Sequence, residues 1–128
     1  MRISNTIGST VLEEITIAAK GRFDAVGAFK NAILSFKDGN LTNAGRAVTK
    51  HPKYFGFEST EALTKVYRTP GSLNNLGSSI VKNILRNGVM TTGAGGRYPN
   101  GWTTYTLPNG NAASWDLDGV FIGFRGIK

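Results

Sequence analysis

The hydrophobic periodicity of the chain changes at Gly88, and this change constrains the fold more than any other feature of the sequence. Before Gly88, apolar residues recur every three or four positions, as they do on one side of an α-helix. After it, apolar and polar residues alternate in short segments separated by turn residues, as in half-buried strands. This order predicts an α+β domain in which N-terminal helices pack on one face of a C-terminal four-stranded antiparallel β-meander.

Five helical segments are predicted before Gly88 from their capping residues and apolar stripes. Thr42 and Ser72 are the predicted N-caps of two of them, and residues 69–71 (Thr-Pro-Gly) are predicted to separate the last two. The second segment carries an aromatic stripe that ends at Phe36, which we interpret as core and not as a surface for stacking bases. The predicted helices are residues 10–20, 23–37, 43–51, 61–67 and 73–87.

Four strands are predicted after Gly88. Residues 93–101 are rich in glycine and are expected to form a mobile loop between the first two strands. Asn109-Gly110 is a strong hairpin signal because both residues tolerate a positive φ, and Asp118-Gly119 marks the next turn. The predicted strands are residues 89–92, 102–107, 113–117 and 120–125.

The length of 128 residues predicts one domain, with a helical lead-in over residues 1–38 and a core over residues 39–128. The chain has no cysteine and one histidine, so we expect no disulfide, no zinc centre of the usual kind and no cofactor. No apolar run approaches the roughly 20 residues that span a bilayer, and the N-terminus lacks the pattern of a signal peptide, so we expect neither.

The chain is basic, with 15 lysines and arginines against 8 acidic residues and a net charge of +7. The excess lies in the middle, because residues 39–115 carry eight basic and two acidic side chains. Such a field attracts polyanions. It favours nucleic acid over a membrane, since no amphipathic segment places lysines opposite aromatics. The alternative is a charged surface that only maintains solubility.

The segment from Leu41 to Pro52 holds the only histidine and is interpreted as the functional helix. Arg46 and Lys50 lie four residues apart and therefore share one face of the helix. His51 follows at the helix end, where the helix dipole favours a protonated imidazole. A titratable ring beside two cations is suited to binding and reacting with a phosphate. The alternative is that His51 only caps its own helix.

These residue types are sufficient to cleave RNA without a metal. A base removes the proton of the 2′-hydroxyl, cations stabilise the charged phosphorus intermediate, and an acid protonates the leaving 5′-oxygen. His51 is the only side chain of the chain whose ordinary pKa lies near neutrality, and Arg46 and Lys50 would hold the phosphate. A single histidine excludes the paired-histidine form of this reaction, so the second proton carrier is lysine, tyrosine or water.

Further residues are candidates for holding the RNA. Arg97 lies in the glycine-rich loop, where it could approach a phosphate backbone closely, and Tyr54 could stack a base beside Lys53. Lys82 and Arg86 are either solvated charges or a second phosphate contact. Hydroxyl groups on the strands could hydrogen-bond the phosphoryl oxygens or the 2′-hydroxyl; the candidates are Thr92, Thr103, Thr104 and Ser114.

Three stretches carry a resemblance to a known family: residues 41–52 (LTNAGRAVTKHP), 86–88 (RNG) and 107–124 (LPNGNAASWDLDGVFIGF). They resemble the C-terminal toxin domains of bacterial polymorphic and contact-dependent growth inhibition systems. Within those, the chain is similar to the group that shares the barnase, EndoU, colicin D and RelE type of fold. The resemblance covers residues 41–125, about two-thirds of the chain, and its Gly-Arg-Ala-x-x-Lys-His element is more specific than the hairpin tail.

The resemblance implies an antibacterial ribonuclease that often cuts tRNA in or near the anticodon loop. It also implies a cognate immunity protein, in some cases a host translation factor, and synthesis at the end of a secreted surface effector that acts in the target-cell cytoplasm. Arg46, Lys50 and His51 are the active-site residues that it implies. In relatives an arginine often stands two positions before the aspartate that begins the last turn. Ser114 stands there in this chain, so that phosphate contact is either missing or supplied by Arg97.

Two other classes of function fit the same residues. The first is a non-catalytic RNA- or DNA-binding module that uses the basic face, and the second is a protein-interaction domain whose charge keeps it soluble. The position of His51 between cations, and not within an apolar stripe, favours the enzyme over both.

Overall fold

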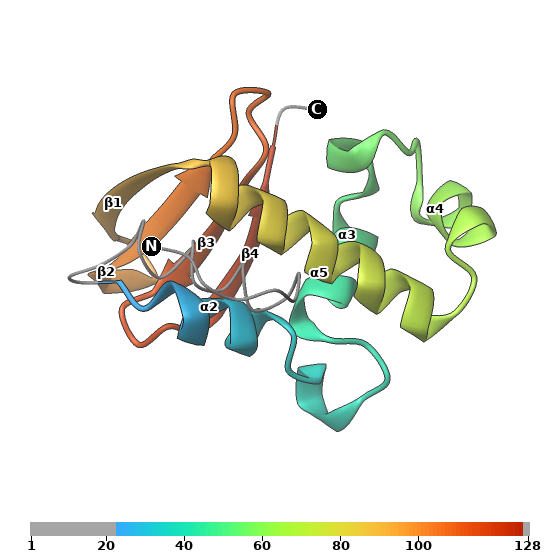
Figure 1. Cartoon of the computed structure of the whole chain (residues 1–128), viewed down its shortest axis with the longest axis horizontal. Helices are drawn as coiled ribbons and strands as arrows, with labels where there is room; N and C mark the ends of the chain where they lie inside the picture. The colour runs from blue at the N-terminus through green and yellow to red at the C-terminus, as the bar shows by residue number, and fades with distance from the viewer. Residues whose placement is uncertain (1–22, 127–128) are drawn as a thin grey trace, which may run out of the picture.

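The computed structural model describes residues 23–126 and has the predicted α+β architecture, with helices packed on a four-stranded antiparallel sheet (Figure 1). The helical elements are α2 (Ala25–Ala32), the 3-10 helix η1 (Phe36–Asp38), α3 (Asn43–Lys50), the 3-10 helix η2 (Pro52–Phe55), α4 (Thr60–Val66) and α5 (Pro70–Asn87). The strands are β1 (Val89–Gly95), β2 (Tyr98–Thr106), β3 (Ala112–Asp116) and β4 (Phe121–Arg125). The predicted helix over residues 10–20 lies outside the described residues.

The sheet is a meander in which each strand pairs with the next, in the order β1-β2-β3-β4. Side chains alternate between its two faces along each strand. Tyr105 and Trp115 belong to the core shared with the helices, so Thr104 and Ser114, which pair directly across β2 and β3, leave the sheet on the other face. β1 and β4 are the two edges, and β2 and β3 separate them.

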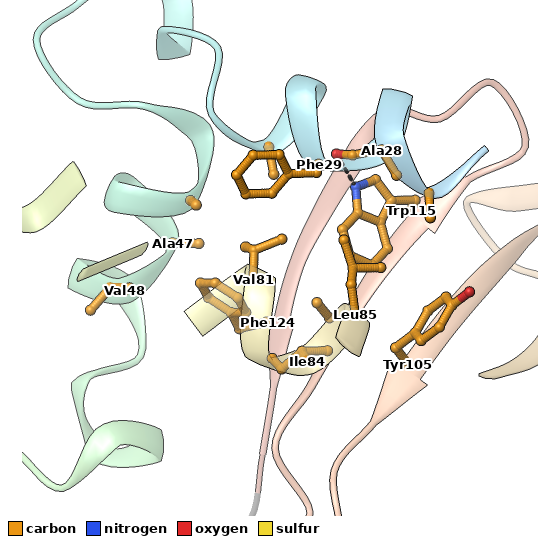
Figure 2. Packing of buried hydrophobic residues seen from close by; sticks show 14 of the residues in the cluster. Ala28, Phe29, Ala47, Val48, Val81, Ile84, Leu85, Tyr105, Trp115 and Phe124 are labelled. Atoms are coloured by element: carbon orange, nitrogen blue, oxygen red, sulfur yellow. Dashed lines mark hydrogen bonds between the residues drawn. The ribbon is translucent and has the colours of Figure 1, made fainter. Parts of the chain in front are cut away.

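Trp115 lies at the centre of the contact between the helices and the sheet (Figure 2). Its side chain is fully buried, and the indole Nε1 donates a hydrogen bond of 2.9 Å to the carbonyl oxygen of Ala28 in α2. Leaving that buried donor without an acceptor would cost about 1–3 kcal/mol. Val81 and Leu85 of α5 pack in the same cluster, so one aromatic side chain links two helices to β3.

Helix α3 approaches α5 closely, because both helices carry small residues where they meet. A Cβ atom added to Gly77 of α5 would lie 2.7 Å from the carbonyl carbon of Ala44 and from the amide nitrogen of Gly45. Thr42 caps α3 as predicted, since its Oγ1 accepts a hydrogen bond of 2.9 Å from the Gly45 amide. The position of α3 is therefore determined by a local cap and by a backbone-to-backbone contact.

The predicted N-cap of the last helix is wrong. α5 begins at Pro70, and Thr69 is its N-cap, because the first helical position needs no amide hydrogen and tolerates proline. The Ser72 amide donates to Thr69 Oγ1 at 3.0 Å, and the Thr69 amide donates to Ser72 Oγ at 3.1 Å. Ser72 thus occupies the N3 position of a capping box and is not the cap itself.

The predicted continuous helix over residues 23–37 is also wrong, because α2 ends at Ala32. Ser35 forms an isolated antiparallel bridge with Thr42, which reverses the chain before α3. Lys37 and Asp38 have positive φ values of 49° and 60° and cannot continue a helix. This reversal removes Phe36 from the predicted core stripe and places it beside α3.

The predicted mobile loop over residues 93–101 is instead the turn end of a β-hairpin formed by β1 and β2. β1 extends to Gly95 and β2 begins at Tyr98, so only Gly96 and Arg97 form the turn. Gly95 and Gly96 have φ values of 140° and 52°, which glycine adopts without a steric penalty. The glycines therefore serve a tight turn and not a flexible segment. The other predicted strand ends differ from the structure by at most one residue.

Candidate active site

Arg46, Lys50 and His51 line one cleft of about 140 Å³ between α3 and β4. Asn43, Arg46 and Lys50 recur at intervals of three and four residues, so they lie on one side of α3. Ala44 and Val48, on the opposite side of the helix, are fully buried. The three residues predicted to be catalytic are thus brought together by the helical spacing and by the burial of the other face.

β4 forms the opposite wall of the cleft, which Phe36 also lines. Phe121, Ile122 and Gly123 line it from the strand, at the place where the register between β3 and β4 shifts. Such a bulge bends an edge strand and turns its side chains. No aspartate or glutamate is found among the described residues that line the cleft, so its fixed charges are both positive.

The guanidinium group of Arg46 stacks on an aromatic ring. Its central carbon lies 4.1 Å from the centroid of the Phe36 ring, a cation–π contact. Stacking uses the face of the guanidinium and leaves its N–H groups, which lie in the plane, to interact with an anion. Within residues 23–126, no carboxylate forms an ion pair with Arg46 or with Lys50. Both charges are therefore available to a ligand.

His51 occupies the C-cap of α3, and its ring stacks on that of Tyr54. The ring centroids are 4.7 Å apart, and the ring planes differ by 13°. Pro52 ends α3 as predicted and begins η2, which brings Tyr54 back over the imidazole. The phenol ring of Tyr54 covers one face of the imidazole. The two imidazole nitrogens interact in the ring plane, so the stacking does not cover them. His51 is half-buried and lines the same cleft as Arg46, so it is not enclosed in the core.

Tyr54 and Lys53 lie beside the cleft on η2. The carbonyl oxygen of Tyr54 accepts a hydrogen bond of 3.1 Å from Nδ2 of Asn111, which precedes β3. Lys53 is exposed and does not line the cleft itself. The two residues predicted to bind substrate from this loop are therefore next to His51, with Tyr54 against the imidazole.

The other predicted substrate contacts lie elsewhere. Arg97 is exposed in the turn between β1 and β2, and β1 is the edge opposite to β4, about 14 Å away across three strand spacings. Thr92 lies on β1 and lines a different groove. The hydroxyl groups of Thr104 and Ser114 hydrogen-bond each other at 2.7 Å, and Ser114 is fully buried. None of these four residues lines the cleft that contains His51.

The predicted site residues do not include Phe36, Asn43 or the β4 residues that line the cleft. Asn43 stands three positions before Arg46, so the helical spacing contains a signal for it. Phe36 reaches Arg46 only because the chain reverses between Ser35 and Thr42, and the pairing of α3 with β4 is a long-range contact. Neither the chain reversal nor the contact between α3 and β4 leaves a local pattern in the sequence.

Residues 23–126 contain no group of three or more histidine, aspartate or glutamate side chains arranged to hold a metal ion. None of the described helices is long and apolar enough to cross a membrane. Comparison of the chain with protein-family models, with curated proteins and with solved structures finds no match in any of the three. The assignment of a function therefore depends on the side chains of the cleft.

Proposed function

We propose that this protein is a metal-independent endoribonuclease that cleaves tRNA. The observation that carries the proposal is the convergence of Arg46, Lys50 and His51 in one cleft without a carboxylate. A volume of about 140 Å³ suits a phosphate group with its ribose oxygens, since pockets for larger organic ligands usually measure roughly 300–1,000 Å³. Fixed cations with a titratable ring are the groups that phosphodiester cleavage by the 2′-hydroxyl needs.

In the proposed reaction, the 2′-oxygen of the RNA forms a bond to phosphorus while the bond from phosphorus to the 5′-oxygen breaks. A base takes the 2′-hydroxyl proton, and an acid gives a proton to the leaving oxygen. His51 serves as one of these two proton carriers, and Arg46 and Lys50 stabilise the charge that develops on the phosphoryl oxygens. The products are a 2′,3′-cyclic phosphate and a 5′-hydroxyl, and no metal takes part.

The biological setting is proposed from the family resemblance alone. In it, the protein is the toxin domain of a secreted bacterial effector, acts on tRNA in the target-cell cytoplasm and is neutralised by a cognate immunity protein. The anticodon loop is the proposed target region, because its unpaired nucleotides can reach a narrow cleft more readily than a duplex can.

The test is to incubate the purified protein with total bacterial tRNA in EDTA and to sequence the new ends. Cleavage at a defined position with a cyclic phosphate supports the proposal. We expect His51→Ala to lower cleavage at least about 100-fold, the loss typical of a general acid or base. Lys65→Ala, which removes an exposed cation from α4, is the matched control and should retain activity. Full activity of the His51→Ala protein would reject the assigned site.

A second candidate is an RNA-binding module that does not cleave. It is favoured by one observation: the cleft contains a single side chain that ordinarily titrates near neutrality, whereas the reaction needs two proton carriers. In that case the protein would retard tRNA on a gel without shortening it. The logarithm of affinity would then fall with the logarithm of salt concentration, with a slope of about −0.7 for each phosphate contact.

A further inference from the structure

A second and larger hollow lies away from the α3 cleft, between α2, the β1–β2 hairpin and the turn from β3 to β4. Its volume is about 760 Å³, within the range of roughly 300–1,000 Å³ that ligand sites usually have. We call it the acidic groove, because Asp24, Asp116 and Asp118 line it. None of its described lining residues is lysine, arginine or histidine, although the chain has 15 basic and 8 acidic residues.

The carboxylates of the acidic groove are only partly used within the protein. Asp24 Oδ1 accepts from the Gly27 amide at 3.0 Å, and Asp116 Oδ1 accepts from the amides of Asp118 and Val120 at 2.9 Å each. The second carboxylate oxygen of each residue, and the whole carboxylate of Asp118, make no hydrogen bond within residues 23–126. Charge complementarity therefore favours a cationic ligand.

A buried hydroxyl group points to a ligand independently of this charge. Thr103 lines the acidic groove and is only 5% exposed. Across the described part of the chain, its hydroxyl has no hydrogen-bond partner. A buried polar group without a partner is unfavourable, so a ligand that supplies one is favoured. Thr92, opposite Thr103 on β1, lines the groove beside it.

The wall of the groove continues into β1, an edge strand of the described sheet. Among the described strands, β1 pairs only with β2, and four of its residues line the groove. Its seven residues, VMTTGAG, include no charged residue and no proline, two devices that prevent a sheet edge from pairing with another chain, and its register with β2 shifts only between Gly93 and Gly95, near the hairpin turn. Val89 is 67% exposed and Met90 is 44% exposed. Such an edge can accept an extended peptide through main-chain hydrogen bonds.

We propose that the acidic groove and the edge of β1 together bind an extended segment of a partner protein that carries lysine or arginine side chains. The segment adds a strand to β1, and its long lysine or arginine side chains extend over β1 and β2 toward the acidic groove. A second copy of this chain fits less well, because β1 pairing with another β1 would bring no cation to Asp116 or Asp118. The site is separate from the α3 cleft, and the proposal does not depend on the ribonuclease activity.

The test uses the full chain and the synthetic peptide acetyl-Thr-Val-Arg-Val-Arg-Val-Thr-amide, with binding measured by calorimetry and by amide chemical shifts. We expect saturable binding and shifts confined to residues 89–95, 101–103 and 116–119. The same peptide with N-methyl groups at alternate positions keeps its charge but cannot pair with an edge, so its affinity should fall at least tenfold. A peptide with glutamate in place of arginine should not bind.

Two variants with matched controls locate the site. Asp118→Asn removes an exposed carboxylate that makes no hydrogen bond within residues 23–126, and should weaken peptide binding about fivefold at low salt. Glu61→Gln on α4 should leave it unchanged. Met90→Lys introduces a cation beside the groove and should weaken binding at least tenfold, whereas Val66→Lys, at an exposed position of α4, should not. Melting temperatures verify that each variant is folded.

Other outcomes overturn the proposal. Shifts centred on α3, or no binding at 1 mM peptide, would reject the acidic groove as the site. Spermidine binding as tightly as the peptide, with the same sensitivity to Asp118→Asn, would make it a site for small cations. A dimer in sedimentation that dissociates in the Met90→Lys variant would identify the occupant as a second copy. tRNA cleavage is measured separately, so failure of one proposal leaves the other to its own test.

Discussion

The α3 cleft and the acidic groove are opposite in charge, and they also differ in how the sequence specifies them. Arg46 and Lys50 come from one helix and follow a single spacing rule, so the sequence alone predicts that these two side chains of the cleft lie together. The groove gathers residues from α2, β1, β2 and the turn before β4, which are distant in the chain. A site on one helix is visible in the sequence, whereas a site between elements requires the sheet order and the packing.

The largest expected difference between the two regions is in catalysis. In the proposed reaction Arg46 is a donor to the phosphate, so Arg46→Ala should lower tRNA cleavage about 100- to 1,000-fold, the usual cost of losing one such group. Asp118→Asn, in the acidic groove, should leave the cleavage rate within about twofold. Rates with excess enzyme measure the chemical step for both variants. Equal losses of cleavage rate in the two variants would mean that the α3 cleft and the acidic groove are not separate in function.

Gly77→Ala should affect the cleft through the position of α3. The added methyl group meets the backbone of Ala44 and Gly45, so the two helices must separate, and the free energy of unfolding should fall by about 1–3 kcal/mol. Denaturant unfolding measures this change. Gly71→Ala, where an added Cβ atom would meet only Thr69 Oγ1 at 3.9 Å, is the control and should be nearly neutral. A neutral Gly77→Ala variant would show that α3 is not held by this contact.

Phe36→Leu should have a smaller effect on the cleft. Loss of the stacking surface under the Arg46 guanidinium removes an interaction worth about 0.5–1 kcal/mol, which corresponds to a two- to fivefold loss of tRNA affinity. Filter binding measures it at a fixed salt concentration. In the Arg46→Ala background, Phe36→Leu should have almost no further effect, because the two residues act together. Additive losses would separate Phe36 from Arg46.

The smallest expected effect concerns Tyr105, whose ring packs against Phe23 at the wall of the acidic groove. Burial raises the pKa of Tyr105 above its ordinary value of 10.0. The unfolded chain therefore loses this proton first, so the contribution of Tyr105 to stability is intact below pH 10 and is lost as the pH rises from 10 through the folded pKa. Tyr105→Phe should decline less between pH 9 and 11 in thermal melts. An identical decline would assign the pH dependence to other groups.

The parts of the molecule that depend on local rules are predictable from the sequence. The change of period at Gly88 predicts the α+β order, and Thr42, Pro52 and the spacing of Arg46 and Lys50 predict α3 and its exposed face. The helical pattern misplaces Phe36, because a bridge between Ser35 and Thr42 overrides it.

The positions of the remaining candidates depend on long-range structure. The sequence groups Arg97 with His51 because nothing in it states that α3 packs against β4, the edge of the sheet opposite to β1. The hydroxyl groups of Thr104 and Ser114 satisfy each other, and that pairing becomes visible only when the register between β2 and β3 is known. Residues whose partners are distant in the chain are therefore the ones that sequence patterns place least well.

The hydrogen bond from Asn111 to the carbonyl oxygen of Tyr54 has a mechanical consequence for the imidazole. Asn111 follows the β2–β3 turn, Tyr54 rests on His51, and the three form a chain of contacts that spans 60 positions of the sequence. Any lengthening or tilting of that turn would be transmitted through the amide and the phenol ring to the histidine. A distant hairpin therefore supports the ring against which the imidazole of His51 rests.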